Sequence, residues 1–299
     1  MASLRSKTLR MEEAPEAMLH IVMDSAGDSP PDWLQTYAIE VIPVNIQFGE
    51  KTYLHGVDLT DEDFYQMVKT YHLIPKTSQP SPHQFIEYYR RIAAPGDTIL
   101  SIHVTSQLSG TYESAVVAAR DLEGELEVIP FDSLAGSAAM AFLCQEARLI
   151  DRAGGTLPEI LARLNFIRDH ITIILTLDTL QFARMSGRVK ALQAALASIL
   201  QIKPIIVLRE GMLEMGERVR TRSRSLEQVI KLVHDRVGSQ LINAAVVHAQ
   251  DLDTAKVLLD KVREAFNLQQ VILTELSIAV AANLGPGTVG IVAYPLKEG

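Results

Sequence analysis

The sequence predicts an α/β protein of two domains: an N-terminal α/β domain with a parallel sheet, residues 19–165, and a C-terminal α+β domain, residues 166–299. Three observations support this prediction. The 299 residues suffice for two modest domains, each with its own core. In the first half, apolar runs of strand length alternate with helical patterns, which is typical of parallel βαβ units. After Gly154-Gly155 and one amphipathic helix, the pattern changes to strand-like runs interleaved with two helices.

The elements of the first half follow a segment, residues 1–18, that we expect to be a poorly ordered leader. Apolar runs predict the strands, and Thr, Ser or Pro before an amphipathic stretch predicts a helix start. In chain order we expect a strand at 19–23, an irregular or edge strand at 39–48 that contains Pro43, helices at 60–71 and 82–93, a strand at 98–104, a helix from 111 to 122, a strand at 126–130 and a helix at 135–152.

The second half is predicted in the same way. A helix at 157–167 precedes strands at 171–178, 203–211, 243–249, 271–277 and 288–295, with helices at 223–237 and 253–266 between them. In parallel sheets, ligands bind at the carboxyl ends of the strands. We therefore expect Asp24-Ser25, Thr105-Ser106 and Asp132-Ser133, which follow predicted strands, to gather at one edge.

Composition and charge exclude several functions. The formal net charge of −8 argues against a broad nucleic-acid surface. The N-terminus lacks the apolar core of a secretory signal, and no run approaches the ~20 apolar residues of a membrane span. We therefore expect a soluble cytoplasmic protein with no stable membrane insertion. Cys144 is the only cysteine and lies in an apolar run, which favours a buried structural thiol.

Motifs for metals and cofactors are absent from the sequence. The eight histidines show no metal-ligand spacing, and no Walker loop, HExxH or GxSxG motif occurs. The segment 285–290, GPGTVG, formally matches GxGxxG, but a strand-like run follows it where a dinucleotide site needs a helix. We therefore expect no metal and no cofactor, and interpret this segment as a structural or ligand-facing turn.

Two hydroxyl clusters are the strongest candidates for a site: TSQPS at 77–81 and TSQLSGT at 105–111. Helix capping is the simpler explanation, but it accounts for one hydroxyl in each cluster. Helix N-termini with free amides and hydroxyls also attract carboxylates and phosphates. From the residues alone, capping and anion binding both remain open.

The order of several motifs resembles the DegV family. They are Asp24-Ser25, IPKTSQPSPHQF at 74–85, LSGTYESA at 108–115, DTLQFARMSGRVK at 178–190, LQIKPIIVLREG at 200–211, RVRTRSRS at 218–225 and the terminal GPGTVG. They extend from about residue 19 to residue 294. The resemblance implies two α/β domains with a long-chain fatty acid, such as palmitate, stearate or oleate, buried between them.

The resemblance also implies roles for individual residues. Thr77 and Ser109 match the hydroxyls that hold the fatty-acid carboxylate, and Ser78, Ser106, Gly110, Asn283 and Arg188 are further candidates for head-group contacts. Family members present the bound acid to a separate ATP-dependent fatty acid kinase, which makes an acyl phosphate for bacterial phospholipid metabolism. On this interpretation the chain is a lipid-binding protein and not an enzyme.

Two departures from the family pattern stand out. Members commonly carry His where this chain has Asn283, and Asn cannot take up a proton near neutral pH. His55 replaces a commonly acidic residue, for which we expect a surface or loop effect. The alternating arginines 218, 220, 222 and 224 are predicted to share one face of a strand or ribbon, where they could dock a negatively charged partner.

Two other classes of function are considered from the residues. A serine-dependent small-molecule hydrolase or transferase would use Ser106 or Ser109 with His103 or His248. No recognised motif places a base beside either serine, so this alternative rests on residue types alone. A regulatory interaction protein, in which a lipid is only structural, is the third class.

Overall fold

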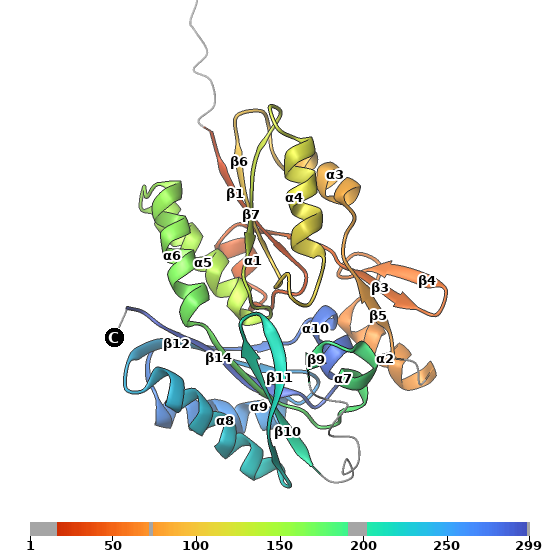
Figure 1. Ribbon diagram of the computed structural model, residues 1–299, viewed down its shortest axis with the longest axis vertical. Helices are drawn as coiled ribbons and strands as arrows, with labels where there is room; N and C mark the ends of the chain where they lie inside the picture. The colour runs from red at the N-terminus through yellow and green to blue at the C-terminus, as the bar shows by residue number, and fades with distance from the viewer. Residues whose placement is uncertain (1–16, 72–73, 191–201, 298–299) are drawn as a thin grey trace, which may run out of the picture.

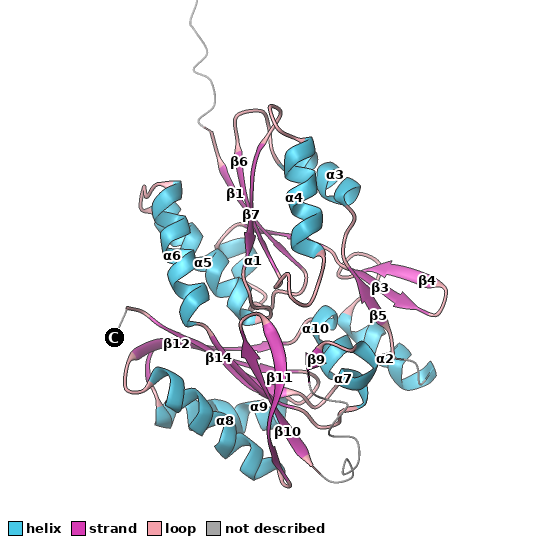
Figure 2. Ribbon diagram, viewed as in Figure 1, coloured by secondary structure: helices cyan, strands magenta, loops and turns pink. Residues whose placement is uncertain are grey.

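The computed structural model describes residues 17–71, 74–190 and 202–297. Most of the predicted leader, residues 1–16, lies outside the described residues. Helices and three β-sheets stack in layers, with two large sheets one above the other and a small sheet at one side (Figures 1 and 2). Among the described residues, no helix combines the length and apolar character needed to span a bilayer.

The first large sheet has the strand order β2-β1-β6-β7, and every neighbouring pair is parallel, as predicted. Its strands are β1 (Leu19–Asp24), β2 (Ile39–Ile42), β6 (Thr98–His103) and β7 (Glu127–Asp132). Its helices are α1 (Trp33–Thr36), α3 (Pro82–Ile92), α4 (Thr111–Asp121) and α5 (Ala138–Arg152). Side chains alternate along β1, so that Val22 packs in the cluster of α3 and α4 while Ile21 and Met23 pack in the cluster of α5. β7 is an edge strand and contains Pro130.

The small sheet corrects the prediction of one irregular strand over residues 39–48. That segment forms β2 of the first sheet and β3 (Asn45–Phe48) of the small one, because Pro43 lies between them and cannot donate to a ladder. β3 pairs with β4 (Lys51–Leu54) and β5 (Lys76–Ser78), both antiparallel. α2 (Asp61–Tyr71) follows β4 in the chain and packs against this sheet.

The second large sheet is mixed, with the order β13-β12-β14-β8-β10-β11-β9. The pairs β12–β13 and β9–β11 are parallel and the others antiparallel. Its strands are β8 (Thr172–Thr176), β9 (Val189–Lys190), β10 (Lys203–Arg209), β11 (Met212–Val219), β12 (Leu241–His248), β13 (Asn267–Glu275) and β14 (Val289–Pro295). All five predicted strands are present, and β9 and β11 were not predicted.

Helices cover both faces of the second sheet. They are α6 (Leu157–His170), α7 (Gln181–Ser186), α8 (Arg222–Val237), α9 (Leu252–Ala265) and α10 (Ile278–Leu284). α8 and α9 form one apolar cluster with the sheet, whereas α5 and α6 lie between the two large sheets (Figure 1). The domain boundary near residue 166 stays a prediction; that residue lies within α6, and the second sheet starts at Thr172.

One continuous apolar cluster joins the two sheets through α5. Phe142 of α5 is fully buried, with its ring 5.8 Å from Trp33 of the first domain and 5.3 Å from Tyr294 of β14. Cys144, two residues further along the helix, is also fully buried, and burial raises the pKa of its thiol. This confirms the structural thiol predicted from the sequence.

We expect Phe142→Ala to lower the free energy of unfolding by about 3–5 kcal/mol, because it leaves a cavity between both sheets. Leu149→Ala is the matched control on the same helix, since Leu149 is 47% exposed and should cost less than about 1 kcal/mol. Urea unfolding of both variants checks the prediction. Equal losses in the two variants would contradict the placement of Phe142.

Candidate functional site

A cavity of about 220 Å³ lies between the two large sheets, beyond the carboxyl ends of β1, β6 and β7. Ala26, Val104 and Ala135, from the loops after these three strands, line it from the first domain. The predicted gathering of polar residues at this edge is confirmed, because Asp24 Oδ2 accepts a hydrogen bond from Val104 N and Asp132 Oδ1 one from Ser106 N. The cavity therefore lies at the edge of the first sheet where α/β sheets of this kind bind ligands.

Apolar side chains of the second domain make up much of the cavity wall. They come from β8, from the β10–β11 hairpin and from α10, and comprise Ile173, Leu175, Leu208, Leu213, Val280 and Leu284. Such a wall is suited to an apolar ligand, whose transfer from water is favourable in proportion to the area buried.

The two hydroxyl clusters meet at the same cavity. Thr77 and Ser78 belong to β5, and Ser109 lies in the loop before α4. Gln79 joins the two segments, because a Cβ atom at Gly110 would lie only 2.8 Å from its Nε2. A larger residue at position 110 would therefore require the Gln79 side chain to shift.

Helix capping explains only part of these clusters. Ser81 caps α3, since its Oγ accepts from Gln84 N at 3.2 Å while Gln84 Oε1 accepts from Ser81 N at 2.8 Å. Thr77 and Ser78 are strand residues and cap nothing. The N-cap of α4 is Gly110, which has no side chain to offer, and the first amide of this helix, Thr111 N, donates to Ser109 Oγ at 3.4 Å.

Ser109 and Thr111 are neighbours through their hydroxyls, 2.8 Å apart. Ser106 differs from the other candidates, because it does not line the cavity and its amide bonds Asp132 at 3.2 Å. The sequence therefore placed Ser109 correctly beside the cavity, but not Ser106.

Asn283 and Arg188 reach the cavity from the second domain. Asn283 Nδ2 donates to Ala279 O at 2.7 Å within α10, which leaves its Oδ1 to face other groups. Arg188 follows the left-handed Gly187 and donates from Nη1 to Ser186 O at 2.5 Å. Ser186 Oγ is 3.3 Å from Asn283 O, so α7 and α10 hold these two candidates together.

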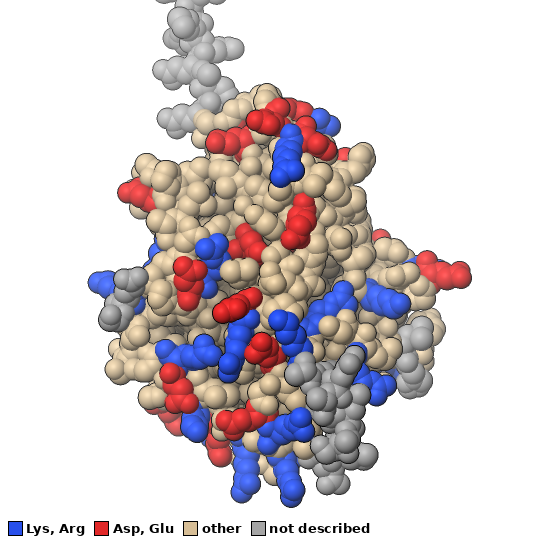
Figure 3. Space-filling view, viewed as in Figure 1, with Lys and Arg blue, Asp and Glu red and all other residues tan. Residues whose placement is uncertain are grey.

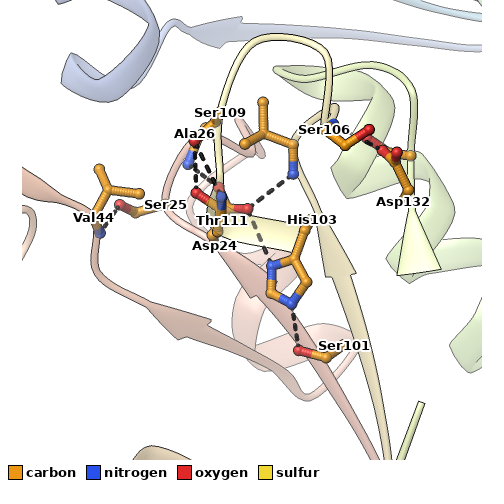
Figure 4. A network of polar contacts seen from close by, with 12 residues as sticks. Asp24, Ser25, Ala26, Val44, Ser101, His103, Ser106, Ser109, Thr111 and Asp132 are labelled. Carbon is orange, nitrogen blue, oxygen red and sulfur yellow. Dashed lines mark hydrogen bonds and ion pairs between the residues drawn. The ribbon is translucent and has the colours of Figure 1, made fainter. Parts of the chain in front are cut away.

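A buried polar network fixes the loops that carry the hydroxyls (Figure 4). Asp24 Oδ1 accepts from Ala26 N and Oδ2 from Val104 N, both at 2.9 Å, and Oδ2 is 3.2 Å from His103 Nδ1. His103 Nε2 is 2.8 Å from Ser101 Oγ, which accepts from Tyr89 OH at 2.8 Å. A neutral imidazole with its proton on Nδ1 satisfies every member of this chain.

This network argues against the serine hydrolase alternative. His103 is fully buried, and its ring atoms are bonded to Asp24 and Ser101, not to Ser106 or Ser109. Ser101 is fully buried as well, so no substrate reaches it. His248 lies on β12, and burial lowers the pKa of its imidazole. The geometry is that of a structural network that resembles a catalytic triad only in composition.

Asp28 links the two domains beside the cavity, a role that the sequence analysis missed. Its carboxylate accepts from Ser137 Oγ, a cavity residue of the first domain, and from Ser277 N, at the start of α10, at 2.8 Å. Burial raises the pKa of Asp28 from 3.8 to about 6. In the sequence, Asp28 is marked only as an acidic residue in the loop after the predicted strand at 19–23.

His55 lies between β4 and α2, and only 12% of its side chain is exposed. Its Nε2 is 3.2 Å from Asp61 Oδ1. The expectation of a surface or loop effect for this residue stays a prediction.

The four alternating arginines do not share one face, so this prediction is wrong. Arg218 lies near the end of β11, Arg220 follows that strand, and Arg222 and Arg224 lie in the first turn of α8, because Thr221 caps a helix there. Arg222 is half-buried and donates from Nη2 to Asp251 Oδ2 and to Gly287 O, both at 2.6 Å. Arg222 stabilises the terminal glycine turn, whereas the other three arginines are exposed on the surface.

The glycine turn at 285–290 is structural, which is one of the two interpretations drawn from the sequence. Gly285 ends α10 at φ +90°, Gly287 has φ +78°, and β14 follows directly. The helix that a dinucleotide site needs after such a motif is absent at this position, which agrees with the sequence analysis.

Comparisons with known proteins agree with this architecture. A family model described as "Uncharacterised protein, DegV family" matches residues 18–296. A DegV domain-containing protein of Halalkalibacterium halodurans is 32% identical over 276 residues, which are 92% of this chain and 97% of the relative. The chain belongs to the DegV family.

Solved structures with the same fold include fatty-acid-binding proteins. A DegV family protein from Thermus thermophilus, whose structure describes fatty acid binding, is 29% identical with a TM-score of 0.84, over 93% of this chain and 100% of that one. DegV from Bacillus subtilis, a fatty acid binding protein, is 25% identical with a TM-score of 0.80, over 93% and 99% of the two chains. The predicted α/β fold, with a parallel N-terminal sheet and a mixed C-terminal sheet, is thus confirmed.

We expect Asp28→Asn to stabilise the protein at neutral pH, because the folded state holds the Asp28 proton more tightly than the unfolded chain does. Stability of the native protein therefore falls as pH rises from about 4 to 6, by up to about 3 kcal/mol. The Tm of the variant should exceed that of the native protein at pH 7.5 and match it near about pH 4. A difference that does not vary with pH would contradict this assignment.

Asp97→Asn is the control, for which we expect the opposite effect on stability at neutral pH. Amides of Met18 and Ala94 hold the pKa of Asp97 below its usual value, so the native carboxylate stabilises the fold at neutral pH and loses that effect as pH falls.

Proposed function

We propose that this chain binds a long-chain fatty acid in the interdomain cavity. The observation that carries the proposal is the cavity itself, which has hydroxyls from two separate segments among its lining and leucine and isoleucine side chains over much of the remainder. Two DegV-family structures of the same fold are of fatty-acid-binding proteins, which supports a ligand of this class.

The carboxylate is assigned to Thr77 and Ser109. A buried carboxylate needs hydrogen bonds, or it takes up a proton. The two hydroxyls supply donors, with Ser78, Gly110, Asn283 and Arg188 lining the same cavity. Because Asn283 is neutral, Arg188 is the cationic side chain that adjoins the head group among these candidates.

The acyl chain is assigned to the apolar wall. Each buried CH₂ contributes about 0.8 kcal/mol, so the tail of palmitate, stearate or oleate dominates the gross affinity. The loss of ligand freedom on binding offsets part of this sum. The hydroxyls orient the acid and contribute the smaller share of the gross affinity.

The bound acid is presented to an ATP-dependent fatty acid kinase. In that reaction a carboxylate oxygen forms a bond to the γ-phosphorus of ATP, the bond to ADP breaks, and an acyl phosphate results. The sequence of this chain has no Walker loop, so the partner supplies the nucleotide site. This chain contributes binding and leaves phosphoryl transfer to the kinase.

Arg218, Arg220 and Arg224 are the candidate docking residues for that partner. They lie around the junction of β11 and α8, where Arg222 is occupied by Asp251 and Gly287. On the face shown in Figure 3, Lys and Arg over the second sheet are interspersed with Asp and Glu. Exposed arginines at this junction would steer an acidic partner.

The combined change Thr77→Val and Ser109→Ala should weaken fatty-acid binding by at least about 100-fold, because hydrogen bonds to a charged group contribute about 1.5–3 kcal/mol each. Displacement of cis-parinaric acid by palmitate measures the affinity, and mass spectrometry of the denatured protein detects co-purified acid. Ser106→Ala is the matched control from the same loop, because Ser106 does not line the cavity. Native protein that carries and binds no fatty acid would refute the proposed function.

Loaded with palmitate and mixed with ATP and a bacterial fatty acid kinase, the native protein should yield palmitoyl phosphate, which hydroxylamine traps as the hydroxamate. Arg218→Glu with Arg220→Glu should reduce the rate at least tenfold without changing palmitate affinity, since these residues lie outside the cavity. Glu214→Lys with Glu217→Lys on β11 provides the opposite charge change. An unchanged rate in the arginine variant would refute docking at this surface.

A further inference from the structure

The β10–β11 hairpin extends from the second sheet to the cavity. Leu208 and Leu213 face each other across it, and both line the cavity. Beyond them, no other described strand pairs with the hairpin, since β8 pairs with 205–207 and β9 with 213–214. The tip, residues 208–212, is therefore held by its own pairing and by whatever it contacts in the first domain.

The tip of the hairpin is a tight turn in which one of the two central residues is buried. Glu210 and Gly211, its two central residues, have φ +48° and +78°, which is typical of a type I′ hairpin turn. Hairpin tips commonly face solvent, but Gly211 is buried against the first domain. A Cβ atom at this position would lie 2.5 Å from Thr105 Oγ1 and 2.9 Å from Gln107 Cγ.

Thr105 is the residue that holds the tip. Its Oγ1 donates to Gly211 O at 3.1 Å, and in the described part of the chain this is the one hydrogen bond between the tip and the first domain. Thr105 is itself fixed, because its amide donates to Ala135 O at 2.8 Å and its Oγ1 accepts from Gln107 N at 3.2 Å. It lines the cavity together with Leu208 and Leu213.

We propose that Thr105 and Gly211 are positioning residues, which hold the hairpin closed over the acyl chain, and that release of their contact is the step through which the ligand exchanges. This inference rests on the proposed function. Separation of the tip from Thr105 moves Leu208 and Leu213 away from the first domain and opens the cavity wall between the sheets. One neutral hydrogen bond is weak enough to break during ligand exchange.

The first test compares two glycines. Gly211→Ala pushes the tip away from Thr105, whereas Gly154→Ala introduces the same strain at the same φ of +78° with nothing within 4 Å. The probe is cis-parinaric acid, whose release into excess oleate is followed by fluorescence. Both its association and its dissociation should be at least tenfold faster in the Gly211 variant, so that Kd changes less than either rate. Rates equal to those of the Gly154 variant would overturn the proposal.

A second pair of variants avoids backbone strain. Thr105→Val removes the hydroxyl and keeps the shape of the side chain, and it should also speed exchange. Thr105→Ser retains the hydroxyl and should restore the native rates. A merely structural role would lower Tm in the valine variant without this change in both exchange rates.

A reversible crosslink between the tip and the first domain should change the rate of ligand exchange in the opposite direction. The Cβ atoms of Gln107 and a residue built at 211 lie 3.4 Å apart, close to the separation of about 3.5–4.5 Å found in disulfides. Gln107→Cys and Gly211→Cys, with Thr105→Ala to make room, should slow exchange at least tenfold when oxidised and release it on reduction. Cys144 is fully buried and does not compete.

The outcomes separate the two proposals. Equal exchange rates in the oxidised and reduced crosslinked protein would refute the hairpin step alone, and so would failure of the crosslink to form. If the native protein does not bind cis-parinaric acid at all, the proposed function fails and the hairpin step fails with it.

Discussion

The packing of α5 and α6 between two sheets is the constraint on which the rest of the structure depends. Phe142 touches aromatic rings of both domains, and small residues around it let α5 approach the first sheet closely. Interiors packed at this density resist gradual deformation. The separation of the sheets is therefore fixed on the α5 side, and the space for a ligand remains on the side where the chain supplies loops, a hairpin and the short helix α10.

Polar groups determine how that space is bordered. Asp24 joins the ends of β1 and β6 from inside the first domain, whereas Asp28 reaches the start of α10 in the second. Both carboxylates are almost wholly buried, but their surroundings differ. Asp24 meets two amides and an imidazole, while burial dominates at Asp28 and raises its pKa. One acid thus fixes the loop that carries Ser109, and the other connects the cavity walls at an energetic cost.

Much of this arrangement could be predicted from the sequence, because long apolar strands and capped helices leave clear periodic signals. The parallel first sheet and the convergence of Thr77 and Ser109 on one cavity followed from those signals and from the motifs. β5, by contrast, is three residues, Lys-Thr-Ser, without apolar alternation. Asp28 and the Thr105–Gly211 contact depend on how the domains meet, which no local pattern encodes. The roles of Thr77 and Ser109 in holding a carboxylate stay predictions.

The edges of the two large sheets differ in their resistance to aggregation. In β7, Pro130 lacks an amide donor and Glu127 and Asp132 place charges at both ends, so this edge is a poor template for a foreign strand. β13 forms an edge of the other sheet with eight successive uncharged residues, 267–274, before Glu275. During folding at high concentration, intermolecular strand addition therefore meets less resistance along β13 than along β7, and a lysine there would act as a gatekeeper.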